Sequence, residues 1–239
     1  MSLGPIDAAA VLARRDEAVS HMDDAGQVEW ITGLPAEFVR GRGRLDGPKR
    51  VRVSLPDGSE RLLTARHAVV LATGSRAVVP PVPGLAEAEP WTSREVTAAK
   101  AVPGRLAVIG GGVVACEMAQ AMHGLGAAET TVLVRGGGLL ERMEPFAGQL
   151  VAESFAASGI TVRTGVEVVR VERPERGGPV TVHLSEGPPV EADELLVATG
   201  RRHRRRRAGV GRTARRQARA GRRQHARDRR RGRLAVRRG

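Results

Sequence analysis

The sequence of 239 residues contains a single cysteine, Cys116, and no run of 18 apolar residues. One cysteine excludes an intramolecular disulfide, a CxxC redox centre and any metal site built from several cysteines, so no metal is predicted. Because Cys116 stands among small residues in a helical pattern, we expect a buried structural thiol. The apolar runs are too short for a membrane-spanning helix. The first residues lack the basic and apolar regions of a signal peptide, so the expected location is the cytoplasm.

The net positive charge of the chain comes from one end of it. Residues 201–239 contain nineteen arginines, no lysine and one acid, a formal charge of +18, whereas the whole chain carries +13. Residues 1–200 are therefore mildly acidic, at −5, and the basicity does not belong to the folded part. We predict that residues 201–239 form an Arg-rich disordered tail, because they have almost no apolar content to bury.

One stretch, Leu106–Gln120, joins an apolar segment to a glycine-rich turn and a helical pattern. Its first four residues are apolar, as in a buried parallel strand. The turn is Gly110, Gly111 and Gly112, and small and apolar residues then recur at helical spacing. Gly110 permits a tight turn, Gly112 lets backbone N–H groups approach a pyrophosphate, and Ala115 lets the helix pack close to the strand.

These residues match G-x-G-x-x-[GA], the glycine pattern of dinucleotide-binding folds, and a second strand at Thr130–Val134 supports that interpretation. The alternative is a glycine-rich turn in another α/β protein. Arg135 follows the second strand, at the place where an acidic residue would bind a ribose 2′-hydroxyl, and an arginine there favours a 2′-phosphate. NADP is therefore favoured over NAD. The alternative for Arg135, and the preferred interpretation for Arg142, is a solvated side chain.

The chain follows the same plan twice. A helix is expected over residues 5–30, interrupted near Asp23, and short alternating strands over 36–72 lead to an apolar strand at 67–73 that ends in Ala-Thr-Gly-Ser. A proline-rich connector at 79–84 precedes the glycine strand. A helix at 145–158 and a second alternating set from 160 to 184 lead to another apolar strand, Glu194–Thr199, that ends in Ala-Thr-Gly-Arg.

In this order the motifs resemble the flavin-dependent pyridine nucleotide-disulfide oxidoreductases, the group of dihydrolipoamide dehydrogenase, mercuric reductase and glutathione reductase. The resemblance implies an α/β fold in which a Rossmann-like NAD(P)-binding domain (85–200) is inserted in a partial FAD-binding domain (1–84), each with an antiparallel β meander. It also implies FAD and NADP or NAD as cofactors, hydride transfer from NAD(P)H to flavin, a dihydrolipoamide dehydrogenase-like enzyme, and a family homodimer. The electron acceptor is not identified.

The resemblance assigns roles to single residues. Glu117 matches the carboxylate that faces the nicotinamide and is the one catalytic candidate; a solvated acid in the first turns of a helix is the alternative. The cofactor-binding candidates match the nucleotide turn, the nucleotide-lining positions and the FAD loop: Gly110, Gly111, Gly112, Val113, Val114, Ala115, Arg135, Val168, Gly200, Ala72, Thr73, Gly74 and Gly43.

Parts of the family pattern are absent from the sequence. The N-terminal FAD glycine motif, the redox dithiol and the dimerisation domain have no counterpart, so we expect a fragment with incomplete activity that binds FAD poorly. We interpret residues 201–239 as a frameshift product, because a shifted reading of one possible coding sequence for Leu234–Gly239 resembles the next FAD motif. The alternatives are an inactive NADP-binding module and polyanion binding through the tail; nucleic acid is not the expected partner.

Overall fold

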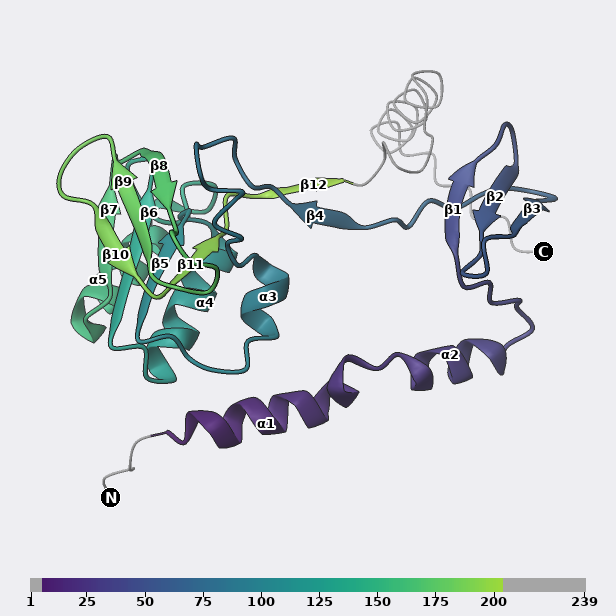
Figure 1. Ribbon diagram of the computed structural model, residues 1–239, viewed down its shortest axis with the longest axis horizontal. Coiled ribbons are helices and arrows are strands. Elements are labelled where there is room, and N and C mark those ends of the chain that lie inside the picture. Colours follow the sequence, from purple (N-terminus) through teal and green to yellow (C-terminus); the bar gives the residue numbers. More distant parts are fainter. Residues whose placement is uncertain (1–5, 204–239) are drawn as a thin grey trace, which may run out of the picture. The chain divides into compact units, whose positions relative to one another are not determined.

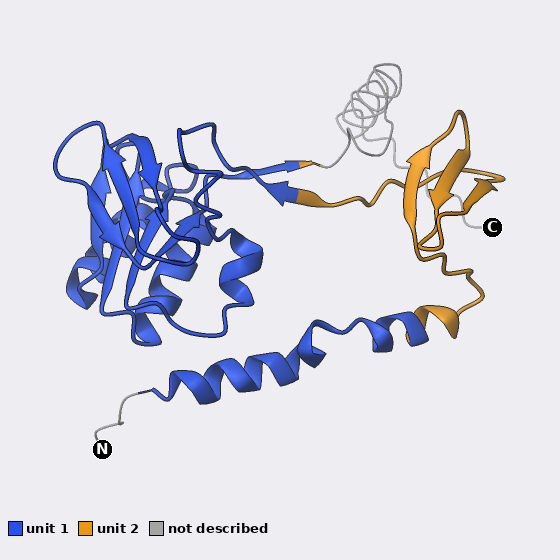
Figure 2. Cartoon of the chain, viewed as in Figure 1, with its two compact units in different colours: residues 1–29, 76–202 blue, residues 30–75, 203–239 orange. Residues whose placement is uncertain are grey.

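The computed structural model describes residues 6–203 (Figure 1). The chain divides into two compact units, residues 1–29 with 76–202 and residues 30–75 with 203–239 (Figure 2). The division does not coincide with the expected boundary at residue 84, and the assignment of the parts to FAD and NAD(P) stays a prediction. The predicted Arg-rich tail lies outside the described residues, apart from its first three.

A parallel sheet forms the centre of the first unit (Figure 1). Its strand order is β11-β5-β6-β7, and all three pairings are parallel. The strands are β5 (Arg105–Ile109), β6 (Glu129–Val134), β7 (Thr161–Thr164) and β11 (Glu194–Val197). Helix α4 (Val113–Gly124) connects β5 to β6, and α5 (Pro145–Ser158) connects β6 to β7. This is the strand–turn–helix–strand order that the sequence predicts.

Alternation along the strands produces two cores, one on each face of the sheet. Leu106 and Val108 of β5 pack with α4 and α5, including Ala119 and Phe155. Ala107 and its alternate neighbours face the opposite way and pack against a second, antiparallel sheet. Because side chains alternate across a strand, a continuous apolar run fills both faces at once.

The second sheet is antiparallel, with the order β10-β9-β8. It consists of β8 (Val168–Glu172), β9 (Val180–Leu184) and β10 (Val190–Ala192). The sequence places residues 160–163 in the same alternating set, and that expectation is wrong. These residues begin β7 and pair with β6, because Gly159, in a left-handed conformation after α5, returns the chain to the parallel sheet.

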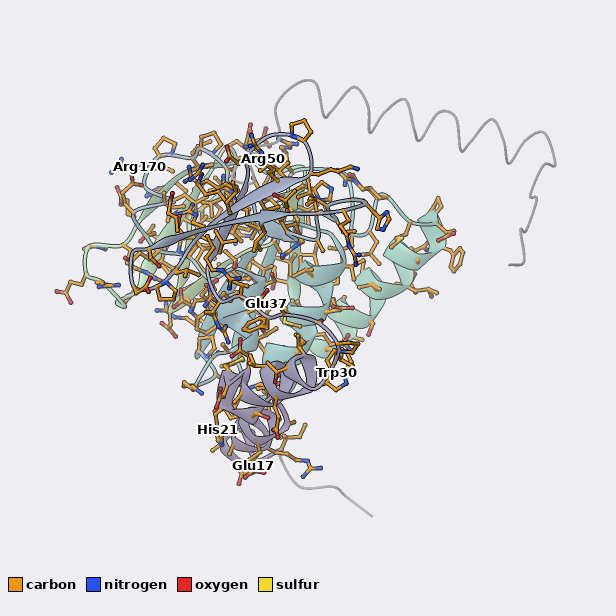
Figure 3. All side chains as sticks on the ribbon, turned by 90° about the vertical axis from the view of Figure 1, so that its right-hand side faces the viewer. Glu17, His21, Trp30, Glu37, Arg50 and Arg170 are labelled. Carbon is orange, nitrogen blue, oxygen red and sulfur yellow. The ribbon has the colours of Figure 1, made fainter. Side chains whose placement is uncertain are left out.

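Short elements complete the first unit or cross its boundary in the chain with the second. Helix α1 (Ala8–Ala18) begins at the predicted cap, where the Asp7 carboxylate accepts the Ala10 N–H. A 3-10 turn at Ser20–Met22 separates it from α2 (Ala25–Thr32), close to the predicted interruption. Trp30, labelled in Figure 3, extends from α2 and is 68% exposed. The remaining elements are α3 (Ser93–Thr97) and the paired strands β4 (Ser75–Ala77) and β12 (Arg201–His203).

The second unit contains the first predicted meander. Strands β1 (Arg42–Leu45), β2 (Arg50–Ser54) and β3 (Glu60–Thr64) form an antiparallel sheet in that order. The apolar strand expected at 67–73 is wrong: these residues form no strand, and Val70 is 86% exposed. A buried parallel strand needs neighbours that satisfy its backbone groups, and the sheet of this unit pairs within itself.

Among the helices of residues 6–203, none is long and apolar enough to cross a membrane.

Candidate functional site

The glycine turn lies at the carboxyl edge of the parallel sheet, between β5 and α4. Gly110 has φ +128°, and a Cβ there would lie 2.6 Å from the Ala198 carbonyl oxygen of the neighbouring strand. Its N–H donates to the Leu133 carbonyl at 2.9 Å. Only glycine fits this position, because both the conformation and the close approach of two backbones exclude a side chain.

Gly111 and Gly112 are constrained differently. A Cβ on Gly111 would lie 2.8 Å from Cγ1 of Val134, so this glycine allows the turn to pack against β6. A Cβ on Gly112 would meet nothing within 4 Å, and its φ of −86° suits any residue. The fold therefore does not require glycine at 112, although it does at 110 and 111.

Gly112 is the N-cap residue of α4 and offers no side chain to cap it. The first N–H groups of a helix, here those of Val113, Val114 and Ala115, have no acceptor within the helix. They lie at the positive end of the helix dipole, beside the open space next to Gly112. This geometry fits a pyrophosphate, whose oxygens would accept these hydrogen bonds.

Helix α4 is held against the sheet by small side chains. Ala115 and Ala119 are fully buried, which confirms the packing expected for the third small position of the motif. Cys116 is also buried, and its Sγ lies 3.9 Å from the Gly111 carbonyl oxygen. Burial, with a smaller contribution from the Glu117 carboxylate, raises the pKa of this thiol. Cys116 is therefore a protonated structural thiol at neutral pH.

The other nucleotide candidates occupy different environments. Arg135 and Gly200 are exposed and follow β6 and β11, at the same edge of the sheet as Gly110. Glu117 is exposed on the second turn of α4 and makes no ion pair within the described part of the chain. Val168 is 8% exposed and packs in the core between the two sheets. Its side chain contributes to that core.

The loop after β6 is anchored at three points. The Leu140 N–H donates to the Gly111 carbonyl at 2.7 Å, which joins the loop to the glycine turn. The Gly165 N–H donates to the Gly136 carbonyl at 2.8 Å. The Gly137 N–H donates to Oε1 of Glu141 at 2.6 Å. No local sequence pattern marks Glu141, because only the turn of the loop brings its carboxylate back to Gly137.

The FAD candidates do not form a cradle for a second dinucleotide. Ala72, Thr73 and Gly74 are exposed in an irregular segment, and a Cβ on Gly74 would meet nothing within 4 Å. Gly43 lies in β1 of an antiparallel sheet and precedes no helix. Within residues 6–203, the glycine turn before α4 joins a buried strand directly to a helix, whereas the glycines at 136–138 lie several residues before α5. Among the described residues, this turn is therefore the one place whose geometry fits a dinucleotide pyrophosphate, and Gly43 and residues 72–74 add no second one.

No group of three or more His, Cys, Asp or Glu side chains in the described region could hold a metal ion.

The chain matches the family model described as pyridine nucleotide-disulphide oxidoreductase over residues 5–223. It is 38% identical to a mercuric reductase of Shigella flexneri over 82% of this chain and 35% of the relative. A glutathione reductase of Burkholderia cepacia is 34% identical over 80% of this chain and 40% of the relative. The chain thus spans 35% to 40% of the length of these two relatives.

Two solved structures have a similar fold. The HOCl-induced flavoprotein disulfide reductase RclA of Escherichia coli aligns with a TM-score of 0.73 at 23% identity, over 85% of this chain and 46% of its own. LpdA of Mycobacterium tuberculosis aligns with a TM-score of 0.72 at 24% identity, over 88% and 47%. At these identities the likeness shows the fold alone, and it agrees with the α/β architecture that the sequence predicts.

Proposed function

We propose, since this chain belongs to the pyridine nucleotide-disulphide oxidoreductase family, that it is the nicotinamide nucleotide-binding part of an FAD-dependent oxidoreductase. The site is the glycine turn before α4. The pyrophosphate lies against Gly112 and the first N–H groups of α4, and the adenosine ribose extends toward the loop that begins at Arg135.

One observation carries this proposal: packing does not require glycine at 112, whereas it does at Gly110 and Gly111. The Cβ of an alanine at 112 would enter open space beside the helix N-terminus. A glycine that packing does not require is expected where a ligand approaches the backbone closely.

The variant Gly112→Ala tests the proposal. We expect it to fold with an unchanged melting temperature and to bind NADPH and NADH at least roughly tenfold more weakly, because the added methyl group displaces the pyrophosphate from the helix N-terminus. Isothermal titration calorimetry gives the affinities, and thermal unfolding gives the stability.

Gly124→Ala is the matched control. Gly124 ends the same helix, and a Cβ there would also meet nothing within 4 Å. We expect this variant to bind both nucleotides as the unchanged chain does. If the unchanged chain binds neither nucleotide, or if both alanine variants bind equally well, the proposed site is wrong.

The finer assignments are also proposals. Arg135 gives the site a preference for NADPH through the 2′-phosphate, and Glu117 faces the nicotinamide. The electron acceptor stays at the level of a class: the sequence suggests a dihydrolipoamide dehydrogenase-like enzyme, whereas the relatives reported above are named mercuric reductase and glutathione reductase. No hydride step is assigned to residues 6–203, because they do not fit the flavin.

A second candidate function is nucleotide binding without catalysis. It is favoured by the single glycine turn of this kind in the described region and by the burial of the one thiol, Cys116. NADPH oxidation in the presence of added FAD and an electron acceptor separates the two candidates, since a binding module gives none.

A further inference from the structure

The loop after β6 contains an acidic side chain that folds back on it. Glu141 is exposed, yet its carboxylate accepts the Gly137 N–H at 2.6 Å. A Cβ on Gly136 would collide with the same carboxylate. The absence of a side chain at 136 is therefore what lets the carboxylate close over the loop, whereas a Cβ on Gly137 would lie at an ordinary contact distance of 3.8 Å from Oε1 of Glu141.

The position of this carboxylate relative to the nucleotide site follows from backbone contacts. Leu140, the residue before Glu141, donates its N–H to the Gly111 carbonyl. Gly137, which the carboxylate contacts, comes two residues after Arg135. The negative charge is thus fixed between the glycine turn and the ribose-side end of β6.

A fixed carboxylate at this place acts differently on the two nicotinamide nucleotides. NADPH carries a 2′-phosphate on the adenosine ribose, and NADH carries a hydroxyl in its place. A carboxylate repels the phosphate and is neutral toward, or accepts a hydrogen bond from, the hydroxyl. Arg135 acts in the opposite direction, because its cation attracts the phosphate.

We propose that Glu141 is a specificity-determining residue. Its carboxylate lowers the ratio of the NADPH affinity to the NADH affinity, so that the two nucleotides bind with comparable affinity. The inference rests on the proposed function, since it concerns the same nucleotide site. The hydrogen bond from the Gly137 N–H holds the Glu141 carboxylate in place. Glu141 therefore stabilises the conformation of the loop and also opposes the attraction of Arg135 for the 2′-phosphate.

The variant Glu141→Gln tests the charge and keeps an oxygen that can accept the Gly137 N–H. We expect the ratio of the NADPH affinity to the NADH affinity to rise roughly fivefold, the effect of removing one unit charge several ångströms from a phosphate in a solvated site. The rise should shrink at high salt, which screens that interaction. Calorimetric titration of the full chain with each nucleotide measures both.

Two further variants make the result specific. Glu153→Gln removes the same charge from α5 at a residue whose carboxylate accepts from Gln149, and it should leave the ratio unchanged. Glu141→Ala removes the hydrogen bond to Gly137 together with the charge. The ratio of the NADPH affinity to the NADH affinity should therefore rise as in Glu141→Gln, while both affinities fall. A merely structural role would lower both affinities and leave the ratio constant.

The outcomes separate this inference from the proposed function. If both nucleotides bind and Glu141→Gln leaves their ratio unchanged, the role of Glu141 is overturned and the site stands. If the unchanged chain binds neither nucleotide, the proposed function fails and this inference fails with it.

Discussion

Arg135 and Glu141 place opposite charges in one short loop, and under our proposal the balance between them sets which nucleotide the site prefers. Arg135 is exposed, so its contribution depends on a ligand that brings a complementary charge. A surface arginine contributes little to stability. Its effect should therefore be visible in binding and absent from unfolding.

We expect Arg135→Glu to lower the ratio of NADPH to NADH affinity at least roughly tenfold, because a cation that pairs with the 2′-phosphate is replaced by an anion that repels it. The two dissociation constants, measured by titration of intrinsic NAD(P)H fluorescence, give this ratio. Arg142→Glu makes the same charge change at an exposed neighbour and should alter the ratio less. Equal changes in the two variants would assign the effect to net charge alone.

At the residue scale, much of the site was predictable from local chemistry. The glycine pattern predicts the turn because few residues other than glycine tolerate the φ of +128° at position 110 or the close contact there with Ala198. Two outcomes were not predictable. Val168 packs in a core, and Glu141 reaches Gly137 through a turn that no local pattern specifies.

Among the elements, β5 is held in place at its start by a charged clamp. The Asp193 carboxylate accepts hydrogen bonds from the Arg105 backbone N–H at 2.9 Å and from Nη2 of its guanidinium at 2.7 Å. The Asp193 N–H donates back to the Arg105 carbonyl. The Arg105 guanidinium lowers the pKa of Asp193, so the carboxylate is charged at neutral pH.

We expect Asp193→Asn to lower the melting temperature by roughly 2–4 °C at neutral pH, since a charge-assisted contact becomes a neutral one. A carboxyl group whose pKa is lowered by folding stabilises the protein above its unfolded pKa, and this contribution is lost as the pH falls through the folded pKa. The difference between the two proteins should therefore shrink progressively as the pH falls below the ordinary pKa of an aspartate. Thermal unfolding between neutral pH and about pH 3 measures it.

Glu186→Gln, at an exposed carboxylate outside this contact, is the control and should unfold like the unchanged chain. A difference for Asp193→Asn that persists undiminished in acid would mean that packing, and not the carboxylate charge, links Asp193 to β5.

Elements with their own boundary signals were predicted well. Helix α5 begins at Pro145 and ends before Gly159, as the sequence indicates. The strand expected at 67–73 was wrong, although its composition is as apolar as that of β11. Strand β11 lies beside β5, whereas residues 67–73 form no strand in the described region. Apolar composition alone does not provide a hydrogen-bonding neighbour.

For the whole molecule, the decisive feature is that residues 6–203 contain one glycine turn leading directly from a buried strand into a helix N-terminus, at β5 and α4. We expect the 239-residue chain, incubated with FAD and passed through gel filtration, to retain no stoichiometric flavin absorbance, because Gly43 and residues 72–74 provide no helix N-terminus for a second pyrophosphate. NADPH binding measured on the same sample is the control for a folded protein. Retention of one flavin per chain would contradict the fit described above.

The local structure of this protein follows from its sequence alone: the buried strand at Leu106–Ile109, the glycine turn and the helix after it. The same residues carry the likeness to the family whose model the chain matches. These features follow from backbone freedom and apolar periodicity, which act over a few residues. Tertiary structure decided which sheet residues 160–163 join and that residues 67–73 form no strand. It also brought the Glu141 carboxylate to Gly137. Those outcomes depend on partners distant in sequence or on the path of a loop, which no local pattern contains.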